Sequence, residues 1–133
     1  MAARSSYIGL DVRTKPMKGY TKAKLANQKK NPNKLKYYYK YFGGSDGKGN
    51  VTEGGRKPAG IFLTLVSDVR YAITKASFHP RNKQLFPVQV DHRHLVILDV
   101  NTKPKSVYYK VQITDASNGY CKFWCDPRVT NTD

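Results

Sequence analysis

Two segments near the C-terminus place aromatic rings and amines on one face, a combination suited to binding single-stranded nucleic acid. In residues 107–113 (VYYKVQI) and 120–125 (YCKFWC), apolar side chains alternate with aromatic and basic ones. Rings of the outward set would stack on bases, at about 1–3 kcal/mol per base, and its amines would pair with phosphates. The alternative is that Trp124 packs under the N-terminal segment or against a neighbouring subunit. The outward set consists of Tyr108, Lys110, Tyr120, Lys122 and Trp124.

A second basic and aromatic strip falls in residues 34–42 (KLKYYYKYF), and it continues a run of bases that begins near the N-terminus. Such a strip would follow a phosphate backbone, or it would be a solvated edge strand that lysines protect against aggregation. The predicted polyanion-binding residues of this region are Arg13, Lys15, Lys18, Lys22, Lys24, Lys29, Lys30, Lys34, Lys36, Tyr38 and Lys40.

The charge of the chain is strongly positive and unevenly distributed. Its 133 residues include 24 Lys and Arg against 9 Asp and Glu, a formal net charge of +15. Residues 1–40 hold eleven of the bases and one acid, a net +10. A field of this size favours an anionic partner: nucleic acid, with a single strand preferred, or an acidic protein surface. Anionic lipid fits less well, because no segment approaches the ~20 apolar residues of a membrane span and no secretory signal is recognised.

Residues that could bind metal or catalyse a reaction are few. Cys121 and Cys125 have zinc-ligand chemistry, as do His92 and His94, but C-x₃-C in a strand and an isolated H-x-H depart from the usual zinc spacings. We therefore expect no metal and no cofactor. A small basic ribonuclease using His79, His92 or His94 is an alternative, but no catalytic motif supports it, and we expect no enzyme. The cysteines are too far apart along a strand for a disulfide, which predicts a reducing, intracellular compartment or a virion.

The N-terminal residues 1–33 are interpreted as a basic arm that becomes ordered mainly on a partner, because few apolar residues recur in them with a regular period. A short helix over residues 21–30, ended by Asn31-Pro32, is the one element expected there. Residues 10–16 (LDVRTKP) recur as residues 98–104 (LDVNTKP), which indicates either a repeat or a shared strand-then-turn solution.

Residues 34–133 are predicted to form a single β-rich domain with a glycine-rich loop at 43–60. Apolar alternation or short apolar runs predict its strands, and only residues 69–78 are ambiguous between strand and helix. Ser67-Asp68 and Asn118-Gly119 are predicted turns. The expected fold is all-β, a small antiparallel sandwich or open barrel of about six to eight strands with an extended basic N-terminal arm. The predicted strands are residues 34–42, 60–66, 69–78, 85–90, 95–100, 107–113 and 120–125.

A basic arm followed by a compact β domain resembles the layout of small viral or phage coat proteins. That resemblance implies a non-enzymatic structural protein of a capsid or virion, which binds nucleic acid through the arm and assembles with copies of itself. Two alternatives stay open: a basic linker or scaffold subunit in a large assembly of acidic proteins, and a free single-stranded nucleic-acid-binding protein. Lys-rich segments serve all three.

Overall fold

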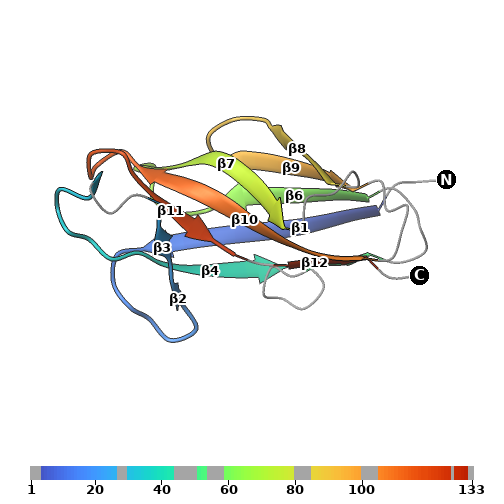
Figure 1. Ribbon diagram of the computed structural model, residues 1–133, viewed down its shortest axis with the longest axis horizontal. Coiled ribbons are helices and arrows are strands. Elements are labelled where there is room, and N and C mark those ends of the chain that lie inside the picture. Colours follow the sequence, from blue (N-terminus) through green and yellow to red (C-terminus); the bar gives the residue numbers. More distant parts are fainter. Residues whose placement is uncertain are drawn as a thin grey trace.

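The computed structural model describes residues 4–26, 30–43, 51–53, 59–79, 85–99, 105–126 and 128–131. Within these ranges the chain is all-β, with two six-stranded sheets that face each other as an open sandwich (Figure 1). The expected all-β class and the open sandwich are confirmed, but the expected purely antiparallel pairing is wrong, because each sheet contains a parallel pair. The strands are more numerous than expected, because very short ones extend both sheets. No helix in the described ranges is long and apolar enough to cross a membrane.

The first sheet, sheet A, combines antiparallel pairs with one parallel pair. Its central strand β1 pairs antiparallel with β4 and parallel with β6. Its strands, in spatial order, are β2 (Thr21–Lys22), β4 (Tyr38–Gly43), β1 (Arg4–Arg13), β6 (Ala59–Leu65), β9 (His94–Asp99) and β8 (Leu85–Gln89).

The second sheet, sheet B, is built around the long strand β10. One edge of β10 pairs with β7, and the other pairs with β11 and then β12, all antiparallel. Its strands are β3 (Lys24–Leu25), β11 (Cys121–Cys125), β10 (Lys105–Asp115), β12 (Arg128–Asn131), β5 (Val51–Glu53) and β7 (Tyr71–His79). Residues 69–78, ambiguous in sequence, are thus mainly strand.

The core forms where the inward faces of the two sheets meet. Alternation places Tyr39 and Tyr41 of β4 inward, and the same period buries Tyr109 on β10. The rings of Tyr37 and Phe123 stack across the sandwich with centroids 4.1 Å apart, and the Tyr41 hydroxyl donates to the Cys125 carbonyl. Each large side chain buried in this way contributes roughly 1.5–3 kcal/mol.

The N-terminal segment differs from the expected arm. Residues 4–13 form β1 in the middle of sheet A, and Ile8, Leu10 and Val12 are buried in the core. Their alternation with a period of two was a strand signal, but the many bases nearby led to the interpretation as an arm. The expected helix over residues 21–30 is also wrong over its first half, where β2 and β3 form short strands. Ordering mainly on a partner is therefore wrong for the residues of β1, and it stays a prediction for the rest of residues 1–33.

The glycine-rich loop and the sequence echo have partial structural descriptions. Residues 51–53 of the predicted loop form β5, which pairs parallel with β12, while 44–50 and 54–58 lie outside the described residues. In the echo, Leu10 is buried and its counterpart Leu98 is exposed, so the two copies do not occupy equivalent environments. Residues 100–104 of the second copy also lie outside the description.

Candidate functional site

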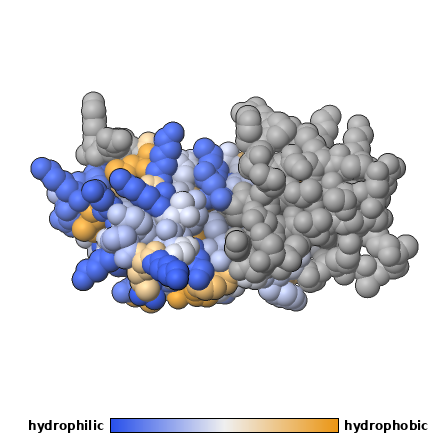
Figure 2. Space-filling model, turned by 90° about the horizontal axis from the view of Figure 1, so that it is seen from below, coloured by the Kyte–Doolittle hydropathy of each residue, from blue (hydrophilic) through white to orange (hydrophobic). Residues whose placement is uncertain are grey.

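Lysines gather where the segment between β3 and β4 meets the short strands, at the left end of the molecule in Figure 1. Figure 2 shows hydrophilic side chains crowded at that same end. A groove there has a volume of about 570 Å³, and its lining includes the apolar residues Leu25 and Leu35. Its basic lining consists of Lys22, Lys24, Lys34 and Lys36. We call it the lysine groove.

A second hollow adjoins the turn between β10 and β11, and we call it the tyrosine groove. Lys30 and Lys122 contribute its amines, and Tyr120 contributes an aromatic ring that is 65% exposed. Like the lysine groove, it has no Asp or Glu among its described lining residues. Together the two grooves offer six amines and one accessible ring to an anionic ligand.

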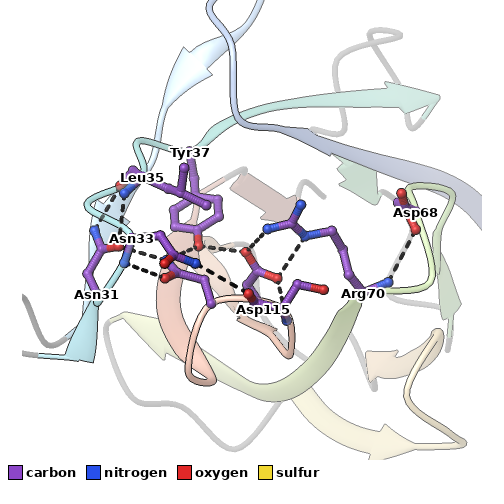
Figure 3. Close-up of polar contacts among 9 residues, drawn as sticks. Asn31, Asn33, Leu35, Tyr37, Asp68, Arg70 and Asp115 are labelled. Carbon is purple, nitrogen blue, oxygen red and sulfur yellow. Dashed lines mark hydrogen bonds and ion pairs between the residues drawn. The ribbon is translucent and has the colours of Figure 1, made fainter.

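A buried polar network fixes the position of these segments (Figure 3). At its centre is the Asp115 carboxylate, which is fully buried. Arg70 donates to both of its oxygens, from Nε to Oδ1 at 2.8 Å and from Nη2 to Oδ2 at 2.6 Å. The hydroxyl of Tyr37 donates to Oδ2 at 2.7 Å. The backbone N–H of Ser117 also donates to Oδ1, at 3.0 Å. A buried charge needs such compensation, and here one cation, one hydroxyl and one backbone N–H provide it.

The network continues from Tyr37 into the segment that carries the groove lysines. Asn118, fully buried in the β10–β11 turn, donates from Nδ2 to the Tyr37 hydroxyl and to Oδ1 of Asn31. Its own Oδ1 accepts from the backbone N–H of Asn33 at 2.9 Å. Asn31 in turn closes a loop with both backbone groups of Leu35. Residues 31–37 are therefore fastened to the hairpin on which Tyr120 and Lys122 lie.

The electrostatics of the network follow from burial and pairing. Burial alone would raise the pKa of Asp115, but the hydrogen bonds from Arg70 and Tyr37 outweigh it and hold the pKa below its ordinary value. Burial also raises the pKa of the Tyr37 phenol well above its usual range. Asp115 is therefore ionised and Tyr37 neutral at neutral pH.

Backbone strain is concentrated at the two grooves. Among the described non-glycine residues, positive φ angles occur at Lys34 (51°) and Tyr120 (59°). Such angles are uncommon for side chains of this kind, and they cluster at functional sites in many proteins. Gly119 also has a positive φ, and a Cβ there would lie 2.9 Å from Cγ of Pro32. The sequence predicted positive φ angles at Asn118 and Gly119, whereas the structure has them at Gly119 and Tyr120.

The aromatic strip predicted for the final hairpin is only partly assembled. For the described side chains, residues 109–113 of β10 and 121–125 of β11, the inward and outward faces are as predicted. However, Trp124 is half-buried, and the Nζ of Lys110 lies 4.3 Å from its ring centroid, so the lysine covers part of the ring. Tyr120 and Lys122 belong to the tyrosine groove instead. The side chain of Tyr108 lies outside the description.

The other predicted binding residues separate into three groups. Arg13 is engaged by Asp11, with Nε 2.9 Å from Oδ2. Tyr38 and Lys40 lie on the outer face of sheet A and do not line the lysine groove, although Tyr38 pairs across the strands with the groove residue Lys22. Lys15 and Lys18 are exposed in the segment before β2, and Lys29 lies outside the described residues.

The residues weighed for a zinc site are not brought together. Cys121 and Cys125 are free thiols buried in the core, and burial raises the pKa of each. His92 and His94 are exposed, and Nδ1 of His94 contacts the Asp91 carboxylate at 2.9 Å. In the described ranges, no cluster of three His, Cys, Asp or Glu could hold a metal ion.

Sequence reasoning missed the residues that position the site. These residues form hydrogen bonds between segments that are 45 to 87 residues apart in the sequence. They are the three asparagines, Tyr37, Arg70 and Asp115. Local pattern carried one signal: a buried Asp and Asn within the predicted turn region 114–119 would each require a partner.

Comparisons with known proteins identify a fold and no family. No protein-family model and no curated protein matches the sequence. The crystal structure of inclusion body protein PixA from Burkholderia cenocepacia J2315 matches 98% of this chain and 96% of its own, with a TM-score of 0.56 and 12% identity. An endo-fucoidan hydrolase of glycoside hydrolase family 107 matches 93% of this chain but 24% of its own, with a TM-score of 0.45 and 13% identity. The chain thus has the fold of the inclusion body protein.

Proposed function

We propose that this chain is a non-enzymatic structural protein that binds nucleic acid through the lysine and tyrosine grooves, in the manner of a small coat protein. The observation that carries the proposal is the convergence of six lysines on two adjoining grooves without an acidic side chain in their described linings. The proposed role as a structural protein agrees with the name of the inclusion body protein, which has a similar fold.

A single strand fits these grooves better than a duplex. Tyr120 offers a flat, exposed ring in the groove that Lys30 and Lys122 also line, which suits an unstacked base flanked by phosphates. If all six groove lysines neutralise phosphates, the logarithm of the binding constant should fall with the logarithm of salt concentration with a slope of about −4.

The test is titration of a fluorescent single-stranded oligonucleotide with the full chain at several salt concentrations. Lys36→Glu should weaken binding by at least about tenfold and make the salt slope shallower by about one. Lys75→Glu is the matched control, because it makes the same charge change at an exposed lysine on β7, outside both grooves. Lys34→Gly removes a groove amine at a backbone position that glycine prefers, so loss of fold would not explain weaker binding.

Three outcomes would overturn the proposal. Equal losses in the Lys36 and Lys75 variants would mean that net charge alone, and not the grooves, drives binding. A salt response near zero would exclude the phosphate contacts. Failure to bind the oligonucleotide at low salt, with tight binding of polyglutamate, would favour the linker or scaffold function among acidic proteins.

A further inference from the structure

The outer face of sheet A carries a continuous apolar patch that no other part of the described structure covers. The rings of Tyr7 and Phe62, neighbours on β1 and β6, stack with centroids 5.3 Å apart. Tyr7 is 70% exposed, an unusual state for a stacked ring. The patch consists of Tyr7, Phe42, Phe62, Phe86, Val88 and Leu98, all exposed.

Strand register makes these side chains one surface. Phe62 lies opposite Val96 on β9, which lies opposite Val88 on the edge strand β8. Leu98 and Phe86 form the next cross-strand pair. The Phe62 ring lies over Gly60, whose missing Cβ would be 3.0 Å from the ring, so this aromatic side chain lies flat along the sheet.

The size of the patch matches one side of a homodimer interface. A full aromatic side chain has about 200 Å² of surface, so the exposed fractions of the four rings give roughly 400 Å² before Val88 and Leu98 are included. A standard interface buries about 800 Å² per partner, of which about 65% is apolar in homodimers. The largest apolar patches on monomers are roughly 300–600 Å² and are often functional.

The distribution of charged side chains on sheet A favours an uncharged partner for the patch. The described outward side chains that carry charge on sheet A lie toward the basic end, and they include Asp11, Arg13 and Lys40. The patch lies toward the other end, where β4 ends and β6 begins (Figure 1). None of the six patch residues is itself charged, and among the described residues the one cation found at a patch ring is Lys40, whose Nζ lies 5.0 Å from the Phe42 ring centroid. An identical apolar surface would be complementary to it in flatness and polarity.

We propose that sheet A pairs face to face with sheet A of a second copy, about a two-fold axis that makes the strands of the two copies antiparallel. This arrangement sends the two basic ends in opposite directions. Because the ten-residue β1 alone spans about 33 Å, the basic ends would be separated by about three Debye lengths at 0.1 M salt. Both pairs of grooves stay open, and the pairing does not depend on polyanion binding.

The experiment is sedimentation velocity of the nuclease-treated full chain over a range of concentration and salt. The wild-type chain should approach about 30 kDa, twice the 15.1 kDa of one chain. Phe62→Lys, in the middle of the patch, should raise the dimer dissociation constant at least tenfold. Val69→Lys adds the same charge at a side chain that is 91% exposed in the turn before β7, and it should leave the constant unchanged.

Salt separates this pairing from the proposed function. Rising salt should strengthen the dimer, because it screens like charges and favours apolar burial, whereas it weakens nucleic-acid binding. Circular dichroism checks the fold of each variant, and Phe86→Lys on the edge strand β8 is a second patch variant in case Phe62→Lys unfolds. A monomeric wild-type chain at every concentration would overturn the proposal, as would a dimer that persists in both folded patch variants. Binding of the monomer to neutral phosphatidylcholine vesicles would assign the patch to lipid instead.

Discussion

Replacement of Asp115 by Asn tests the network that holds the candidate site together. The change keeps the size of the side chain but removes its charge, and the new amide presents a donor to a site where Arg70 and Tyr37 already donate. At least one of these hydrogen bonds must be lost, and the Arg70 guanidinium loses its counter-ion.

The expected loss of stability follows from burial. Hydrogen bonds to charged groups contribute about 1.5–3 kcal/mol each, and breaking a buried ion pair costs about 3–5 kcal/mol. The Arg70 side chain is 28% exposed, so water compensates part of its loss. We therefore expect Asp115→Asn to lower the free energy of unfolding by about 3 kcal/mol, near the lower end of that range.

The pH dependence gives this prediction a sign. The pKa of Asp115 in the folded chain lies below its ordinary value of 3.8, so its contribution is complete above that pH and is lost as the pH falls through the folded value. The stability difference between the wild-type chain and Asp115→Asn should be largest at neutral pH and should shrink below about pH 4.

Urea denaturation, followed by the fluorescence of the single tryptophan, measures both effects. Asp91→Asn is the control, because it removes an exposed carboxylate whose ion pair with His94 is at the surface, and it should leave stability nearly unchanged. The reasoning would be refuted if Asp115→Asn matched the wild-type chain at pH 7, or if its deficit persisted unchanged in acid.

Two further predictions concern the core. Phe123→Ala should lower the free energy of unfolding by about 3–5 kcal/mol, because the Phe123 ring is fully buried against Tyr37. Trp124→Ala should lower it by less, because Trp124 is half-buried on the outer face, and thermal unfolding of the two variants compares them. Deletion of residues 1–13 should abolish cooperative unfolding in calorimetry, because it removes the central strand of sheet A. A truncated chain that still folds would support the sequence-based interpretation of these residues as a dispensable arm.

Local alternation in the sequence determined much of the fold. The period of two assigned the inward and outward faces of β10 and β11, because steric constraints point successive side chains of an extended chain to opposite sides. The net charge is also fixed by the sequence, because it is a sum over residues that folding does not change. The anionic partner that this charge predicts stays a prediction.

Tertiary structure decided which strands become neighbours and which cations meet. Strand β1 was misinterpreted because its alternating apolar residues stand beside a dense run of bases, and its place in the sheet depends on parallel pairing with β6, more than fifty residues away. Likewise, Lys22 and Lys36 share a groove only because β2 and β4 pair, and Asp115 meets Arg70 across 45 positions. Such contacts are selected by burial and hydrogen-bond satisfaction over the whole chain, energies that a local window of sequence does not contain.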